Sequence, residues 1–159
     1  MLITLILILI IIICLILILY VTTYNNLATY KTKIEKAESI IDDALREKYD
    51  IICKLNIQIK KEVTKKDYLK DYIELKDKRI TNYEMDRKLT EAMNIITEVK
   101  NDHEKLNNKE FNELLKKIDE LNETLASSKT YYNNNTSKLN QIIREFPSNI
   151  VAKIHRYKI

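Results

Sequence analysis

The sequence predicts an all-α protein in which an N-terminal transmembrane helix continues into an antiparallel bundle of three long helices plus a short C-terminal helix. Three observations predict this fold. The chain of 159 residues begins with a long apolar run, contains no glycine, and has a single proline, Pro147. After the apolar run, apolar residues recur at steps of three and four, as they do on the packed face of a helix. Nothing before Pro147 obliges a helix to kink.

The apolar run LITLILILIIIICLILILYV occupies residues 2–21 and predicts a membrane anchor over residues 1–22. Twenty helical residues rise about 30 Å, the thickness of the hydrocarbon core of a bilayer. No basic side chain precedes the run and no small-residue cleavage site follows it, which favours an uncleaved anchor over a signal peptide. The lipid bilayer, contacted by residues 2–21, is therefore the first predicted partner.

The charges that follow the anchor predict its orientation. Residues 1–30 contain no Asp, Glu, Lys or Arg, whereas Lys31, Lys33 and Lys36 come directly afterwards. The positive-inside rule then places the N-terminus outside and residues 31–159 in the cytoplasm. The two cysteines, Cys14 and Cys53, imply no disulfide framework, which suits a cytoplasmic domain.

Residues 23–159 are predicted to form one helical-bundle domain, with helices at about 23–77, 82–105, 109–145 and 149–157. The first helix should continue out of the anchor, because one apolar stripe runs through it. Lys48 interrupts this stripe, and its long stem can pack while its ammonium reaches water. The stripe consists of Leu27, Tyr30, Ile34, Ala37, Ile41, Leu45, Ile52, Leu55, Ile59 and Val63.

The second helix is predicted to begin at a capping box formed by Thr81 and Glu84, after a hairpin near residues 78–82. An alternative start is Thr64, with Asp67 in the same relation. Its apolar face comprises Leu89, Ala92, Ile96, Val99, His103 and Leu106.

The third helix has the most regular pattern, and its start resembles a cap formed by Asn107 and Glu110. A buried asparagine at its seam position 135 can fix register or partner number. The predicted seam consists of Phe111, Leu114, Ile118, Leu121, Leu125, Ser128, Tyr132, Asn135, Leu139, Ile142 and Phe146.

The composition also argues against several functions. Without glycine the chain cannot form a Walker A loop, a dinucleotide-binding turn or a nucleophile elbow. His103 is followed by Glu104, but the second histidine of an H-E-x-x-H motif is missing, and His155 is alone in the tail, so each is expected to pack or cap. We therefore expect no catalytic residue, no cofactor, no metal and no enzymatic activity. The net charge of +4 lies in residues 138–159, so it is no general nucleic-acid footprint, and no nucleic-acid partner is expected.

Three stretches resemble the LemA family. YNNLATYKTKIEKAESIIDDALREKYDII, residues 24–52, is similar to the family's segment after the membrane helix, with Tyr24, Asn25 and Leu27 matching its Tyr-Asn-x-Leu element. LTEAM, from Leu89, fits the second helix of the family. The stretch from residue 107 to 158 resembles its C-terminal block, which ends in Phe-Pro-x-Asn. The matching residues there are Phe111, Tyr132, Asn133, Asn140, Phe146, Pro147 and Asn149.

The chain departs from the family pattern at Cys53, where proline is expected, and its middle is shortened. The resemblance implies a bacterial, single-pass membrane protein with a helical-bundle domain. The family has no assigned enzymatic activity, so no catalytic residues carry over.

Two classes of function remain open. The first is a membrane-anchored scaffold or protein-interaction module that binds an unknown protein or a second copy of itself. The second is a structural coiled-coil tether, such as a self-assembling envelope or phage component. The tail offers one further partner. An apolar face over residues 150–158, beside Lys153, Arg156 and Lys158, either lies on anionic lipid or packs as a cap on the bundle. We favour the packed cap.

Overall fold

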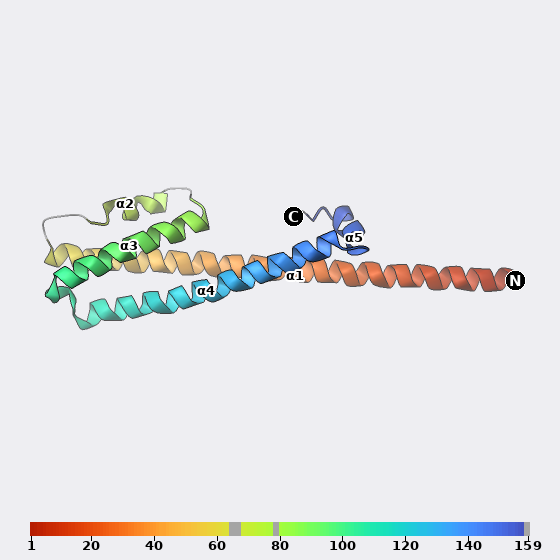
Figure 1. The fold of residues 1–159 in the computed structure, drawn as a ribbon, viewed down its shortest axis with the longest axis horizontal. Helices are drawn as coiled ribbons and strands as arrows, with labels where there is room; N and C mark the ends of the chain where they lie inside the picture. The colour runs from red at the N-terminus through yellow and green to blue at the C-terminus, as the bar shows by residue number, and fades with distance from the viewer. Residues whose placement is uncertain (64–67, 78–79, 158–159) are drawn as a thin grey trace. The chain divides into compact units, whose positions relative to one another are not determined.

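The computed structural model describes residues 1–63, 68–77 and 80–157, which form helices and no strand (Figure 1). The elements are α1 (Leu2–Glu62), α2 (Lys70–Ile73), the 3₁₀ helix η1 (Glu74–Asp77), α3 (Asn82–Asp102), the 3₁₀ helix η2 (Glu104–Leu106), α4 (Lys109–Arg144) and α5 (Ser148–Ile154). The predicted all-α fold, with a long N-terminal helix packed on others, is confirmed. The chain divides into two compact units. Unit 1 comprises Met1–Ala37 and Thr130–Ile159, and unit 2 comprises Glu38–Lys129.

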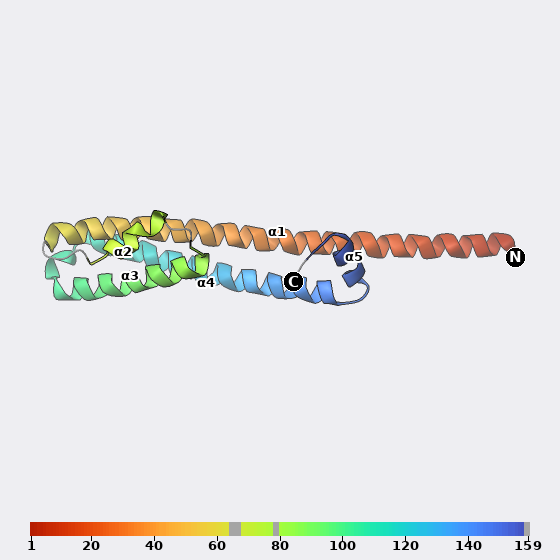
Figure 2. The same ribbon diagram turned by 90° about the horizontal axis from the view of Figure 1, so that it is seen from above.

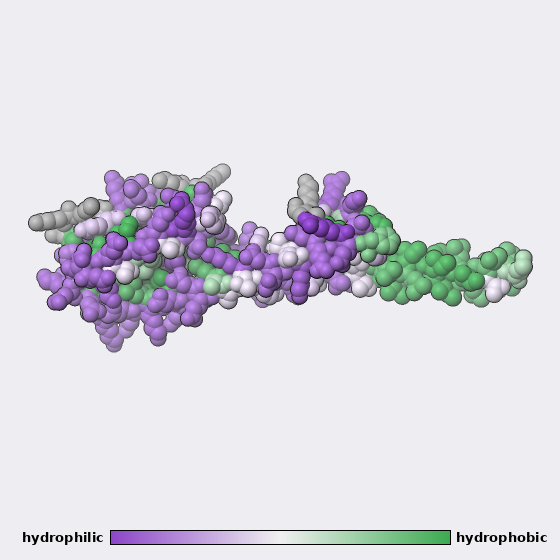
Figure 3. Space-filling model, viewed as in Figure 1, coloured by the Kyte–Doolittle hydropathy of each residue, from purple (hydrophilic) through white to green (hydrophobic). Residues whose placement is uncertain are grey.

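The N-terminal part of α1 exposes apolar side chains on every face. Each Leu and Ile from Leu2 to Leu19 is at least 47% exposed, and this segment is uniformly hydrophobic in Figure 3. Exposure of so much contiguous apolar surface to water would be strongly unfavourable. By length and composition, α1 is the one helix among the described residues that could cross a membrane.

Unit 2 has a core made by the stripe of α1 together with α3 and α4. The buried members of the predicted stripe include Ile41, Leu45, Ile52, Leu55 and Ile59. They meet the buried faces of α3, at Leu89, Ala92, Ile96 and Val99, and of α4, at Phe111, Ile118 and Leu125. The three-to-four spacing therefore identified the core on all three helices.

The first helix is shorter than predicted. Helix α1 ends at Glu62 rather than near residue 77, and the chain returns through α2 and η1 before α3 begins. As a result α3 runs in the same direction as α1, whereas α4 runs opposite to both (Figure 1). The physical reason is burial: Leu69 and Leu75, at most 2% exposed, pack back onto the unit. A longer helix would carry them past the end where α3 meets α4. The alternative helix start at Thr64 and Asp67 lies outside the described residues.

The predicted start of α3 is confirmed. Thr81 Oγ1 accepts a hydrogen bond from the backbone N–H of Glu84, and the Glu84 carboxylate accepts one from the N–H of Thr81, both at 3.2 Å. This is a capping box, which satisfies two donors that the helix leaves free.

Helix α4 begins at Lys109, as predicted, but its capping residue differs from the predicted one by one position. Asn108, not Asn107, accepts the N–H of Phe111, at 2.9 Å. Two contacts then define the antiparallel pairing of α3 and α4: Lys100 with Asn112 and Asp86 with Lys129.

Unit 1 brings the C-terminal half of α4 and all of α5 against α1. Figure 2 shows α5 folded back beside α1. The buried centre is formed by Leu27, Leu139, Val151 and Ala152, with Tyr20, Tyr30, Ile34, Ile142, Ile143 and Tyr157 packed around it. The predicted packing of the tail as a cap is therefore seen, although only part of its apolar face is used.

The predicted seam of the third helix is wrong at its last residue, Phe146. Helix α4 ends at Arg144, and the side chain of Phe146 is 80% exposed instead of buried. The following Pro147 has no N–H and disfavours helical geometry at the residue before it. The chain therefore turns here and takes Phe146 off the buried face.

Candidate functional site

The most distinctive contacts in unit 1 lie where the apolar segment of α1 ends. Tyr20 Oη and His155 Nε2 share a hydrogen bond of 2.7 Å. The ring of Tyr24 also lies against His155, with 4.7 Å between ring centroids. His155 is thus not the isolated tail residue that the sequence implied. These contacts hold the end of α5 beside the last residues of the predicted anchor.

A second feature of this region is a row of exposed apolar side chains. Phe146, Ile150 and Ile154 follow one another at intervals of four residues, and at least half of each is exposed. Val151 and Ala152 point the other way, into the core of unit 1. The predicted apolar face of the tail is therefore divided between packing and solvent.

A basic pocket lies between α1 and the residues that follow α5. Its volume is about 420 Å³, and its lining is Tyr24, Lys31, Leu139, His155, Arg156 and Tyr157. Lys31 also forms an exposed ion pair with Glu35, at 3.7 Å, which water screens strongly. We name this feature the α1–α5 pocket.

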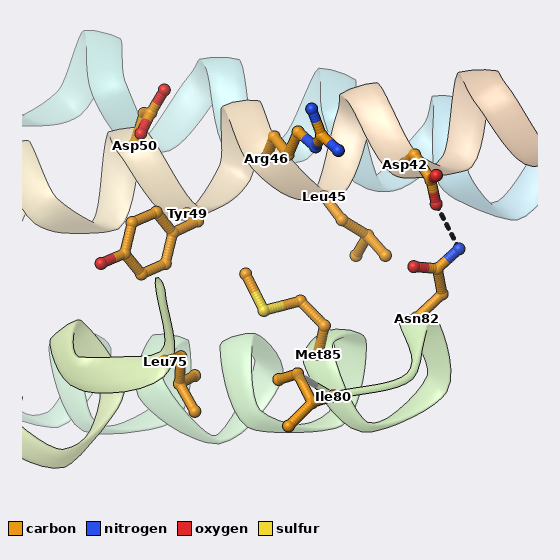
Figure 4. Close-up of a pocket in the computed structure, with 9 residues that line it drawn as sticks. All are labelled: Asp42, Leu45, Arg46, Tyr49, Asp50, Leu75, Ile80, Asn82 and Met85. Atoms are coloured by element: carbon orange, nitrogen blue, oxygen red, sulfur yellow. Dashed lines mark hydrogen bonds between the residues drawn. The ribbon is translucent and has the colours of Figure 1, made fainter. Parts of the chain in front are cut away.

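A larger pocket, of about 530 Å³, opens in unit 2 between α1 and the start of α3 (Figure 4). Leu45, Leu75, Ile80 and Met85 form its apolar floor, and Asp42, Arg46 and Asp50 line its rim on the α1 side. Asp42 accepts a hydrogen bond from the side chain of Asn82. Its carboxylate is thereby engaged in holding α3 to α1. We name this feature the α1–α3 pocket.

Lys48 occupies the centre of unit 2. It is 3% exposed, and its Nζ donates a hydrogen bond of 2.8 Å to Asn122 Oδ1. Burial lowers the pKa of Lys48, while the Asp86 carboxylate raises it and the Lys129 ammonium lowers it further. The prediction that its head would reach water is wrong, because a partner on α4 takes the place of solvent.

The residues of the LemA-like motifs have different environments. Leu27 and Phe111 are fully buried, and Tyr132 and Asn140 are half-buried. Asn25, Asn133, Phe146 and Pro147 are exposed. The Oδ1 atom of Asn149 is buried without a hydrogen-bond partner in the structure. The motif therefore does not converge on one site.

His103 and the acidic residues of the described ranges do not converge either. His103 lies between α3 and η2, where its backbone N–H bonds to the carbonyl of Lys100 and its side chain forms no capping hydrogen bond to η2. Within residues 1–63, 68–77 and 80–157, no three His, Cys, Asp or Glu side chains are placed to hold a metal ion.

Sequence patterns did not reveal the pairs Lys48–Asn122 and Tyr20–His155, because their members lie 74 and 135 positions apart. No local signal links residues at such separations.

Fold and contacts together define an all-α bundle protein with an N-terminal helix long and apolar enough to cross a membrane. The sequence model of the LemA family matches residues 37–159, which is most of the chain. The chain therefore belongs to the LemA family, as its motifs indicated, and the match begins after Tyr24, Asn25 and Leu27. A search of curated proteins found no match. A search of solved structures found none.

Proposed function

We propose that this protein is a membrane-anchored helical scaffold that presents unit 2 to a protein partner and carries no catalytic activity of its own. One observation supports the proposal. The exposed apolar segment and the residues that α1 contributes to the core of unit 2 belong to the same unbroken helix, α1. A chain whose membrane span and packed domain share one helix keeps that domain at the membrane.

The orientation of the proposed anchor follows from charge. The first charged side chains after the apolar segment are those of Lys31 and Lys33, so in this proposal the bundle lies in the cytoplasm of a bacterial cell. The test is labelling of an added cysteine at exposed Tyr83 with a membrane-impermeant maleimide, in a chain lacking Cys14 and Cys53. We expect labelling only after permeabilisation, whereas labelling of intact cells would reverse the orientation.

The anchor itself is tested by extraction. Membranes that contain the full chain are washed with alkaline carbonate, which releases peripheral proteins. We expect the protein to remain in the membrane, and a variant with Ile10→Lys and Ile11→Lys to be released. Charges at the centre of a span cost several kcal/mol each, about 2.5 to 3.5 on the insertion scale. Release of the unaltered chain from the membrane by carbonate would contradict the proposed membrane anchor.

The α1–α3 pocket is the proposed contact surface for the protein partner. Its apolar floor provides burial, and its charged rim, with Arg46 and Asp50, provides specificity.

The partner test is photocrosslinking in membranes, with the crosslinker at Arg46 and a matched control at exposed Lys116. A discrete adduct from position 46 alone supports the surface. Equal crosslinking from both positions, or turnover of a substrate by the purified chain, contradicts the proposal.

The alternative class, a self-assembling coiled-coil tether, predicts a different particle. Light scattering of the detergent-solubilised chain distinguishes the two. A monomer supports the scaffold, whereas an elongated oligomer of defined size supports the tether.

A further inference from the structure

The end of unit 1 that carries α5 combines three features of a lipid contact. Exposed apolar side chains occur in α5, at Ile150 and Ile154, and in the turn before it, at Phe146. A basic pocket containing Lys31 and Arg156 lies beside them. His155, which lines this pocket, is hydrogen-bonded to Tyr20, near the end of the apolar segment of α1.

We propose that this region is a binding site for an anionic phospholipid, in which α5 enters the headgroup layer and the α1–α5 pocket holds the lipid phosphate. The inference rests on the proposed membrane anchor and goes beyond it, because it assigns a ligand class to residues that the anchor does not use.

The depth of the site follows from Tyr20 and Tyr24. Tyrosine rings concentrate at the level of the headgroups, where one end is apolar and the other is hydrated. Both rings contact His155, which directly follows α5. If residues 2–21 span the hydrocarbon core, α5 therefore lies at the headgroup level. Figure 3 shows hydrophobic surface continuing from the apolar segment to the region of α5.

The apolar side chains would otherwise face water. Burial of Phe and Ile side chains away from water is favourable. Phe146 lies in the turn between α4 and α5, and its side chain is 80% exposed. Seating Phe146, Ile150 and Ile154 among acyl chains removes this exposed apolar surface.

The backbone of Arg156 provides a second, independent observation. Helix α5 ends in a Schellman motif, with the N–H of Tyr157 bonded to the carbonyl of Ala152 and the N–H of Arg156 to that of Lys153. The motif requires a left-handed residue, and Arg156 adopts φ of 55°. Glycine is usual at this position, since a side chain costs about 1–2 kcal/mol there. Arg156, held in this conformation, lines the α1–α5 pocket.

The chemistry of the pocket fits a phosphate. Arg156 offers a planar set of donors and Lys31 a compact charge, and both groups are standard phosphate ligands. Tyr157 packs on the apolar centre of unit 1 beside them. The lining therefore has a polar part and an apolar part, which match the headgroup and the acyl chains of a lipid. Each basic group near an anionic leaflet contributes about 1 kcal/mol, or roughly fivefold in affinity.

The first experiment measures insertion of α5. The chain has no tryptophan, so Phe146→Trp places one reporter in the full-length protein, with Ile150→Trp as a second variant and Tyr83→Trp as an exposed reference in unit 2. The proteins are reconstituted in vesicles of phosphatidylcholine and phosphatidylglycerol, with brominated acyl chains as quenchers. We expect strong quenching at positions 146 and 150 and little at position 83.

The second experiment measures lipid selectivity. The full chain is reconstituted with a spin-labelled phosphatidylglycerol or phosphatidylcholine, and the preference for the anionic lipid is compared among variants. We expect Arg156→Gly to lose about fivefold in preference without losing stability, because glycine suits the turn. Lys31→Gln should lose a similar amount, and the exposed control Lys109→Gln should lose nothing.

The outcomes separate the two proposals. A chain that fails to float with vesicles overturns the anchor and the lipid site together. A chain that floats while positions 146 and 150 remain unquenched, or whose Arg156→Gly variant keeps its preference, overturns only the lipid site. Displacement of the labelled lipid by inorganic phosphate would assign the pocket to a soluble anion and also overturn it.

Discussion

The Nζ atom of Lys48 on α1 donates a hydrogen bond to Oδ1 of Asn122 on α4, at 2.8 Å. Lys48 is the only lysine or arginine among the residues described as buried. Its ammonium is thus bound by one neutral oxygen, with the Asp86 carboxylate near enough to favour the charge. Desolvation outweighs that attraction, since the net effect is a lowered pKa. This pair gives two predictions.

Replacement of Lys48 by methionine should stabilise unit 2 by about 1 kcal/mol, or leave it unchanged. Methionine fills a similar volume, and a buried charge exchanged for an apolar group is often neutral or stabilising. Asn122 is exposed, so its amide can bond to water instead. Urea unfolding of the detergent-solubilised chain measures the change. The matched variant Asn122→Ala should instead destabilise by about 1–3 kcal/mol, because it leaves the ammonium without its acceptor. Destabilisation by Lys48→Met would show that the lysine contributes net stability.

The same lysine should make stability depend on pH. Its pKa in the folded chain is below the usual 10.5. Between the lowered value and 10.5, the unfolded chain binds more protons, so the free energy of unfolding contributed by Lys48 rises with pH. At a pH below the lowered pKa, the folded chain bears the full free-energy cost of burying the ammonium. At a pH above 10.5, Lys48 is neutral in both states and this cost is absent. The advantage of Lys48→Met over the unaltered chain should therefore shrink as pH rises through this range. An advantage that grows with pH would contradict the lowered pKa.

The connection between α1 and α3 should depend on Tyr49. Its hydroxyl donates a hydrogen bond of 2.5 Å to the carbonyl of Ile73 at the end of α2. Tyr49→Phe removes this donor and should cost about 1 kcal/mol. Hydrogen exchange should become faster in residues 68–77 and remain unchanged in α4. The control Tyr83→Phe alters a ring that is largely exposed and should change neither region. Uniform acceleration in both variants would contradict a local tether.

The sequence predicted the helices best where periodicity alone determines packing. Helix α4 was predicted at 109–145 and spans Lys109–Arg144, and the capping box at Thr81 located the start of α3. Both features depend on residues within a few positions of one another. The family was also recognisable from sequence, since its motifs are local.

The features that the sequence did not predict depend on distant partners. The stripe of α1 continues in spacing beyond Glu62, and only the burial of Leu69 and Leu75 against unit 2 explains why the helix ends there. The separation of Phe146 from the seam follows from the turn at Pro147. The α1–α5 pocket joins Lys31 to Arg156, which lie in the first and last parts of unit 1, so no pattern in either segment indicates it.

Asn135 provides the last prediction, because its role differs from the one that its seam position suggested. The side chain is 7% exposed, yet its Nδ2 donates to the carbonyl of Tyr131 on the same helix, at 2.7 Å. A bond within one turn specifies neither register nor partner number, unlike the asparagine pairs of coiled coils. Asn135→Leu should therefore raise the free energy of unfolding by about 1 kcal/mol, through apolar burial and better helix propensity. Exposed Asn134→Leu is the matched control for propensity alone and should gain only a few tenths. Light scattering should show the same oligomeric state for the unaltered chain and for Asn135→Leu, and a change in that state would restore the specifying role to Asn135.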